Sequence, residues 1–246
     1  MIGPDERIVA VRALIAGQDP TDALPGAVGW LRRLCTAAVR TVPAFGVGVS
    51  VMNEDGMRGV AAASGPASAA IEERQFARGE GPCIDAVASR RVVLEPDLAH
   101  GSSTRWLAYA PAALAHGIGA VFAFPLQVGA AQLGVMDVYR TGPGPLSDES
   151  LAQALAFAEV ALETLLDAQA KAAIGQAAEG LDHALDSHYV IYQAQGMTMV
   201  DLGIPLADAL ARLRAHAYTH DRPLREIARD VVAGRLRLHP DPPDTS

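Results

Sequence analysis

The chain has 246 residues, half of them hydrophobic, which predicts a soluble globular protein with one or two packed domains. Two cysteines exclude a disulfide framework, and the absence of an export signal at residues 1–7 or of any apolar run near about twenty residues predicts a cytoplasmic protein without a membrane partner. The formal net charge of −8 would argue against nucleic acid if it were evenly spread, but residues 206–238 hold seven arginines against four carboxylates.

The first 146 residues combine helical and strand patterns. Residues 1–26 are expected to form a short helix, over residues 5–16, and a linker. Hydrophobic residues at helical spacing predict a helix over residues 27–42, which Pro43 ends. The period then changes to two, and strands are predicted at residues 45–52, 58–64, 92–94, 120–128 and 132–140. Further helices are predicted at residues 68–77, 84–89 and 103–116, so residues 27–146 are expected to form a mixed α/β sheet domain.

Short motifs in this region point to a known family. They are Gly79-Glu80-Gly81-Pro82-Cys83-Ile84-Asp85-Ala86, Asp97-Leu98, Arg105-Trp106, Gly117-Ile118, Pro125-Leu126 and Leu133-Gly134-Val135-Met136. Together they resemble a GAF domain, which implies a sensor module that binds a small ligand between the sheet and its covering helices, or that dimerises. Cys83, Arg105 and Trp106 are the candidate ligand contacts, although a Trp within an apolar helix is also typical of a core position.

Departures from particular GAF relatives narrow the expected chemistry. The Asn-Lys-Phe-Asp-Glu signature associated with cyclic-nucleotide binding is absent, and Ile84 follows Cys83 where many bilin-attaching cysteines are followed by His. Cys35 is predicted on a different helix from Cys83, so no redox pair of the kind used by sulfoxide-reducing relatives is evident. We therefore expect no enzyme activity, cofactor or metal, and leave the small ligand unidentified.

A linking helix is predicted over residues 147–186. Ser147 is a suitable N-cap, acidic residues follow it in the first turn, and hydrophobic residues then recur at threes and fours. The core of a single small domain could hardly cover the whole hydrophobic stripe of so long a helix. This predicts a homodimer in which the helices of two copies form a coiled coil. The alternative is that the stripe packs on the sheet of its own chain, with room for a break at Gly175 and Gly180.

The last folded region, residues 187–238, reads as three short helices. The first ends at Gly203, where a left-handed stop costs little, and Pro205 opens the second. The third carries a buried stripe that includes Leu224 and Ile227, and Arg225 and Arg229 share its opposite face. The fold class is therefore α+β: a mixed α/β domain, a long helix and an all-α three-helix domain. The tail, residues 239–246, is expected to be disordered.

This C-terminal region also resembles a known family, through motifs in the right order: Gln193-Ala194-Gln195-Gly196-Met197, Gly203-Ile204, Leu213-Arg214 and Leu224-Arg225-Glu226-Ile227-Ala228. They are similar to the ANTAR domain, a three-helix RNA-binding module of bacterial antitermination regulators. The resemblance implies binding of RNA hairpins, with bases stacked on aromatic or guanidinium groups and phosphates held by arginines. The candidate RNA contacts are Gln195, Arg214, Tyr218, Arg222, Arg225 and Arg229.

Three positions depart from that family's pattern. Gln195 stands where Lys is common, His188 where Arg is common, and Pro223 where Lys is common, which weakens the attraction for phosphate. His216 and His220 lie four apart, but no further ligand completes a metal spacing. Two functions remain open: an RNA-binding antitermination regulator under the control of a sensed signal, or a dimeric sensor that docks on a protein without binding RNA.

Overall fold

The computed structural model describes residues 3–19, 26–53, 56–100, 105–173 and 181–239. The chain divides into two compact units, the first comprising residues 1–76 and 80–185 and the second residues 77–79 and 186–246. Each unit is described here by itself. None of the described helices is long and apolar enough to cross a membrane.

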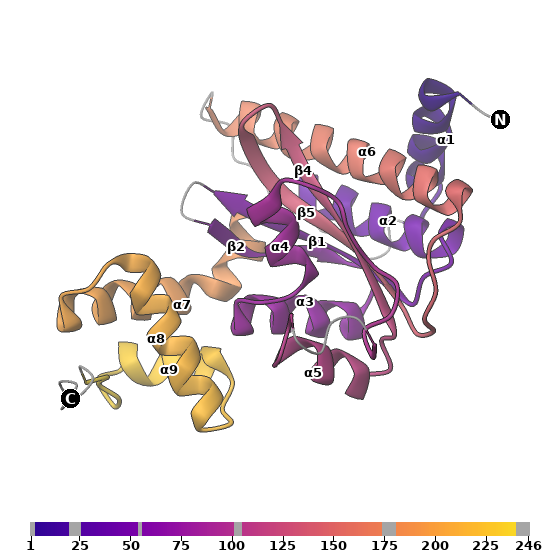
Figure 1. Cartoon of the computed structure of the whole chain (residues 1–246). Helices are drawn as coiled ribbons and strands as arrows, with labels where there is room; N and C mark the ends of the chain where they lie inside the picture. Colours follow the sequence, from indigo (N-terminus) through magenta and orange to yellow (C-terminus); the bar gives the residue numbers. More distant parts are fainter. Residues whose placement is uncertain (1–2, 20–25, 54–55, 101–104, 174–180, 240–246) are drawn as a thin grey trace. The chain divides into compact units, whose positions relative to one another are not determined.

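The first unit is built on a five-stranded sheet (Figure 1). The strands lie in the order β2-β1-β5-β4-β3, and every neighbouring pair is antiparallel. Their bounds are β1 Gly46–Asn53, β2 Gly56–Ala63, β3 Val93–Glu95, β4 Ala120–Val128 and β5 Ala131–Arg140. All five expected strands are confirmed, with ends that differ from the predicted ones by at most two residues.

Helices cover both faces of this sheet (Figure 1). On one face, α1 (Pro4–Ala16), α2 (Gly26–Thr41) and α6 (Asp148–Ala173) share a hydrophobic core with β-strand side chains such as Val49, Phe122 and Val138. On the other, α3 (Pro66–Arg78), α4 (Pro82–Ser89) and α5 (Tyr109–Ala115) cover a second core. Because successive strand residues point to opposite faces, Val138 belongs to the first core and Tyr139 to the second.

Helix α5 is shorter than the sequence predicted. The expected helix over residues 103–116 begins only at Tyr109 in the described residues, and residues 101–104 lie outside them. Pro111 explains the late start, because it has no N–H and is tolerated in a first turn but not in a helix interior. Glu80 Oε1 accepts the N–H groups of Ala108 and Tyr109, at 2.5 and 2.6 Å, and so replaces the missing helical partners.

Helix α6 packs within its own chain. Its buried residues, including Phe157, Ala161 and Leu165, belong to the core beneath α1 and α2, and ion pairs of Arg7 with Glu149 and Arg12 with Glu163 join α1 to it. The described part of the expected linking helix therefore follows the alternative in which the stripe packs on its own sheet. Its predicted continuation through residues 174–180 lies outside the described residues, and the homodimer stays a prediction.

The second unit contains α7 (Leu181–Leu202) from residue 186 onward, together with α8 (Leu206–Thr219) and α9 (Leu224–Val232). Gly203, with φ of +64°, follows α7, and this left-handed conformation suits the expected glycine stop. The buried residues of α8 and α9 repeat at threes and fours, as predicted: Ala209, Leu213, Ala217, Leu224, Ile227, Ala228 and Val231.

Candidate functional site

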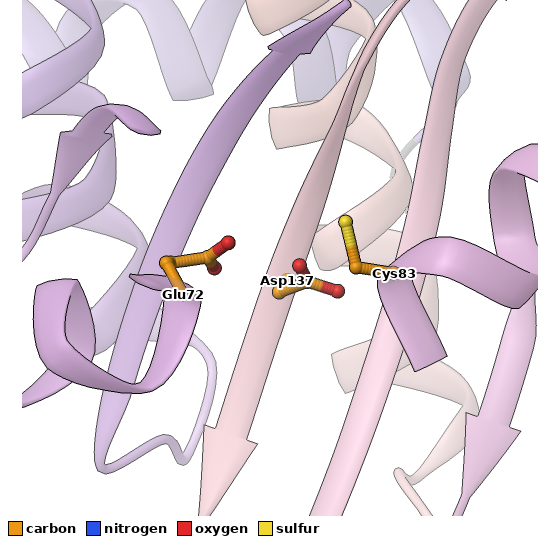
Figure 2. Close-up of side chains that lie close together, drawn as sticks. All are labelled: Glu72, Cys83 and Asp137. Atoms are coloured by element: carbon orange, nitrogen blue, oxygen red, sulfur yellow. The ribbon is translucent and has the colours of Figure 1, made fainter. Parts of the chain in front are cut away.

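A cluster of acidic groups is buried under one helical layer of the first unit (Figure 2). Glu72 comes from α3, Cys83 from the first turn of α4 and Asp137 from β5, and all three are buried. Their carboxylate oxygens and sulfur lie within 4.8 Å of one another. These three residues are called the carboxylate–thiol cluster below.

Neutral hydrogen-bond donors hold the two carboxylates. Glu72 accepts the hydroxyl groups of Ser50 and Tyr139, both at 2.7 Å. The Gln75 side-chain amide donates to the Tyr139 hydroxyl at 2.9 Å and to Asp137 Oδ2 at 3.3 Å. The side-chain oxygen of Gln75, Oε1, accepts a hydrogen bond from the backbone N–H of Cys83 at 2.9 Å. One network therefore joins all three members of the cluster.

Two glycines leave the space for this network. A Cβ at Gly48 on β1 would lie 2.1 Å from Glu72 Oε1, so no larger residue fits without moving the carboxylate. A Cβ at Gly81 would lie 2.6 Å from Gln75 Oε1, and the φ of Gly81, +133°, is a conformation that suits glycine. The Gly-Glu-Gly-Pro-Cys motif therefore shapes the cluster and also supplies its thiol.

Burial raises the pKa of every cluster member and so favours its protonated form. Loss of hydration is the main cause that raises the pKa of Glu72 to about 7, and hydrogen bonds from Tyr139 and Ser50 oppose it. Burial, followed by the charge of Glu72, raises the pKa of Asp137 well above its ordinary value. Burial likewise raises the pKa of the Cys83 thiol, so this Cys is no activated nucleophile in the folded chain.

The three sequence-predicted ligand contacts do not come together at one point. Cys83 belongs to the cluster, whereas Arg105 and Trp106 gather around Asp85. Asp85 Oδ2 accepts the indole N–H of Trp106 at 3.0 Å and lies 2.7 Å from Arg105 Nε. The Arg105 guanidinium lies 4.8 Å from the Trp106 ring centre, and Trp106, 1% exposed, is part of the core.

The sequence analysis missed most of the buried polar residues: Ser50, Glu72, Gln75, Asp137 and Tyr139. Two signals could have found them. Glu72 and Gln75 lie on the buried stripe of α3 that also contains Ile71 and Phe76, and Asp137 is the single charge in the otherwise apolar centre of β5. A charge at a position that periodicity assigns to the core has to be neutralised, hydrogen-bonded or bound to a cation.

The second unit places two of its predicted RNA contacts in internal interactions. Gln195 is 7% exposed, and its amide donates to the Leu206 carbonyl at 2.8 Å, which joins α7 to the start of α8. Arg222 contacts Asp230 at 2.7 Å and Glu226 at 3.7 Å. These ion pairs raise the pKa of Arg222, through the hydrogen bond to Asp230 first.

The remaining predicted contacts lie on α8 and α9. Tyr218 is 67% exposed and follows Arg214 by four residues on α8. Arg229 is exposed and Arg225 half-buried on α9, on the side away from its apolar stripe. His216 and His220 stack with ring centres 4.0 Å apart. Within the described ranges, three potential metal ligands come together in the carboxylate–thiol cluster. These two histidines belong to no such group there.

A covered antiparallel sheet followed by a three-helix unit defines a two-module protein. The family model of the GAF domain matches residues 30–165, more than half of the chain, and the model of the ANTAR domain matches residues 179–232. The chain therefore belongs to the GAF domain family and carries an ANTAR domain after it. The expected architecture is confirmed, and it joins a sensor module to an RNA-binding antitermination module.

Several solved structures are similar to the first unit. One is the GAF domain of a phosphoenolpyruvate-protein phosphotransferase from Coxiella burnetii, with 14% identity and a TM-score of 0.51 over 70% of this chain and 99% of that one. Another is the Acinetobacter GAF domain of a phosphoenolpyruvate-protein phosphotransferase, with 11% identity and a TM-score of 0.49 over 69% and 98%. A type II free methionine-R-sulfoxide reductase from Thermoplasma acidophilum has 19% identity and a TM-score of 0.46 over 57% and 93%. No curated protein matches the chain.

Both modules are sensory or regulatory rather than catalytic by family. Cys35 and Cys83 are not joined in a disulfide, and they lie in separate cores, on opposite faces of the sheet. A disulfide between them would have to pass through the sheet, which agrees with the expectation of no redox pair. The expectation that the chain is not an enzyme stays a prediction.

Proposed function

We propose that this protein is a transcription antitermination regulator that binds RNA hairpins through its ANTAR domain, under the control of a signal received by its GAF domain. The observation that carries the proposal is the arrangement of α9. Its apolar stripe is buried in the second unit, while Arg225 and Arg229 lie together on the other side. The ANTAR match supports a nucleic-acid partner for those cations.

The proposed RNA-binding surface consists of Tyr218, Arg225 and Arg229. The predicted contact Arg214 is half-buried, and burial lowers its pKa to about 10, so it is left out of this surface. The exposed Tyr218 ring offers a flat face on which an unpaired base of a hairpin loop can stack. Arg225 and Arg229, one helical turn apart, provide positive charge for adjacent phosphates. Stacking of one base on such a ring contributes about 1–3 kcal/mol to binding.

Gln195 and Arg222 have a different role in this proposal. Gln195 holds α7 against the start of α8 through its bond to Leu206, and Arg222 holds the chain before α9 through its bond to Asp230. Both residues position the helices that carry the surface. Their substitution is expected to lower RNA affinity by loosening the unit, without altering the number of phosphates contacted.

The test is a salt-series titration of the full chain against tandem RNA hairpins from its own transcript neighbourhood. The logarithm of the binding constant should fall linearly with the logarithm of salt concentration, and Arg229→Gln should reduce that slope by about one. Arg91→Gln is the matched control, because Arg91 is an exposed arginine of the first unit. Binding that is insensitive to salt and equal in both variants would instead indicate a surface for docking on a protein.

A further inference from the structure

The carboxylate–thiol cluster has the donor set of a metal centre. It offers one sulfur, from Cys83, and carboxylate oxygens from Glu72 and Asp137, all brought within 4.8 Å of one another by three different elements. Zinc and similar divalent transition-metal ions bind Cys sulfur at about 2.3 Å and carboxylate oxygen at about 2.0–2.2 Å. At the tetrahedral angle two such bonds hold their donors about 3.5 Å apart, so donors within 4.8 Å of one another have to move inward by up to about 1.3 Å to meet one ion.

Two buried oxygens at this place meet no hydrogen-bond partner in the described part of the chain: Asp137 Oδ1 and the Tyr109 hydroxyl. Both residues are fully buried, at 0% exposure. The charges that act on the Tyr109 hydroxyl are those of Asp137, Glu72 and Cys83, which places it in the field of the cluster. Buried polar atoms are nearly always paired, so two such oxygens beside three potential ligands indicate a bound species.

The charge of the cluster has the same implication. The hydrogen bonds to the two carboxylates come from uncharged groups, the hydroxyls of Ser50 and Tyr139 and the amide of Gln75. Glu72 and Asp137 also share a hydrogen bond, and the Cys83 thiol is hydrogen-bonded to Asp137. No described residue forms an ion pair with Glu72 or Asp137. Buried carboxylates are neutralised by a proton, paired with a cation or bound to a metal, and a divalent ion can replace the protons that burial favours on Glu72 and Asp137.

We propose that Glu72, Cys83 and Asp137 bind a divalent transition-metal cation, Zn²⁺ by the fit of its donors, in the interior of the GAF domain. Three protein ligands leave the fourth tetrahedral position to water or a small anion, and the Tyr109 hydroxyl is the neighbouring donor for a hydrogen bond to it. Gln75 and Tyr139 act as positioning residues, because they hold the carboxylates through hydrogen bonds. The site stands whether or not the ANTAR domain binds RNA.

Co²⁺, which replaces Zn²⁺ and absorbs light, is the probe for the test. The full-length chain is stripped with a chelator and titrated with Co²⁺, with absorption as the readout. We expect one ion per chain and a thiolate-to-cobalt charge-transfer band, which Zn²⁺ then removes by displacement. Cys83→Ser should abolish the band, whereas Cys35→Ser should leave it unchanged, because Cys35 is an equally buried thiol in the other core.

A second variant separates binding from packing. Asp137→Asn keeps the shape of the side chain and should weaken Co²⁺ at least about tenfold, a loss typical of altered metal sites. X-ray absorption at the zinc edge of the wild-type chain, which needs no variant, should find one sulfur at about 2.3 Å together with lighter ligands. No Co²⁺ band, a band that survives Cys83→Ser, or a zinc environment without sulfur would overturn the proposal. Failure to bind RNA would leave it intact.

Discussion

The two units of this chain place their charged side chains in opposite ways. In the ANTAR unit, α9 buries its apolar residues and carries Arg225 and Arg229 on the other side. In the GAF unit, α3 buries Glu72 together with Ile71 and Phe76 on one stripe. A charge on the outer side of a helix costs little and is available to a partner, whereas a buried carboxylate costs several kcal/mol unless something neutralises it.

The comparison separates two kinds of functional surface. The ANTAR helices present cations to a large and strongly charged partner, for which partial exposure and water contact are suitable. The GAF interior holds acidic groups in a closed network, which suits a proton or a small ion but leaves no room for a macromolecule. On the proposed function, a regulator that binds RNA through one unit has, in the other, buried carboxyl groups that can exchange a proton or bind a small ion.

The largest expected effect concerns Trp106, the residue predicted to contact a ligand and found in the core. Trp106→Ala should lower the free energy of unfolding of the GAF unit by about 3–5 kcal/mol, because a fully buried ring is lost. Urea unfolding followed by circular dichroism measures it. Trp30→Ala is the control, since Trp30 is only half-buried, and a similar loss in both variants would show that Trp106 is no core residue.

The sequence predicted the strands and the three C-terminal helices because each of these elements separates polar from apolar residues. Residues 120–128 were predicted with the bounds that β4 has. The outward arginines of α9 follow from the same rule, since a polar residue outside an apolar stripe is expected to face water. Family resemblance then supplied the modules, which periodicity alone does not identify.

The separation of polar from apolar residues along the sequence does not predict the buried polar network. Asp137 contacts Gln75 across 62 positions of sequence and Glu72 is bonded to Tyr139 across 67, distances over which a local pattern has no information. Glu72 lies on the buried stripe of α3, but the helical pattern does not show which residues neutralise it. Gln195 was expected to contact RNA because of the ANTAR resemblance, and in the structure its amide donates to the Leu206 carbonyl.

The next effect, on the order of 3 kcal/mol, is a loss of stability with rising pH in the GAF unit; the lowered pKa values of His216 and Asp230 give the ANTAR unit the opposite dependence. Burial raises the pKa of Glu72 from its ordinary 4.5 to about 7, so between these values the folded chain holds a proton that the unfolded chain has lost. The contribution of Glu72 to the free energy of unfolding should therefore be greatest below pH 4.5 and should fall as the pH rises toward 7.

Thermal unfolding in the presence of a chelator, at several pH values, measures this dependence. Glu72→Gln should make it shallower, because the amide cannot lose a proton. Glu159→Gln, an exposed position on α6, should leave it as in the wild type. A stability that rises with pH across the same window would contradict the assignment of a protonated carboxyl to the GAF interior.

The smallest effects come from a Gly→Ala substitution in each unit, and the two substitutions should change stability in opposite directions. Gly48→Ala should destabilise the GAF unit by about 1–3 kcal/mol, because its Cβ meets the buried Glu72 carboxylate at 2.1 Å, where hydrogen bonds from Tyr139 and Ser50 hold it. Gly196→Ala, within α7, meets no described atom within 4 Å and should stabilise the ANTAR unit by about 0.5–1 kcal/mol, since alanine favours a helix interior. Urea unfolding of the two variants measures both. Equal signs would mean either that Glu72 can move aside or that Gly196 serves a contact beyond the single chain.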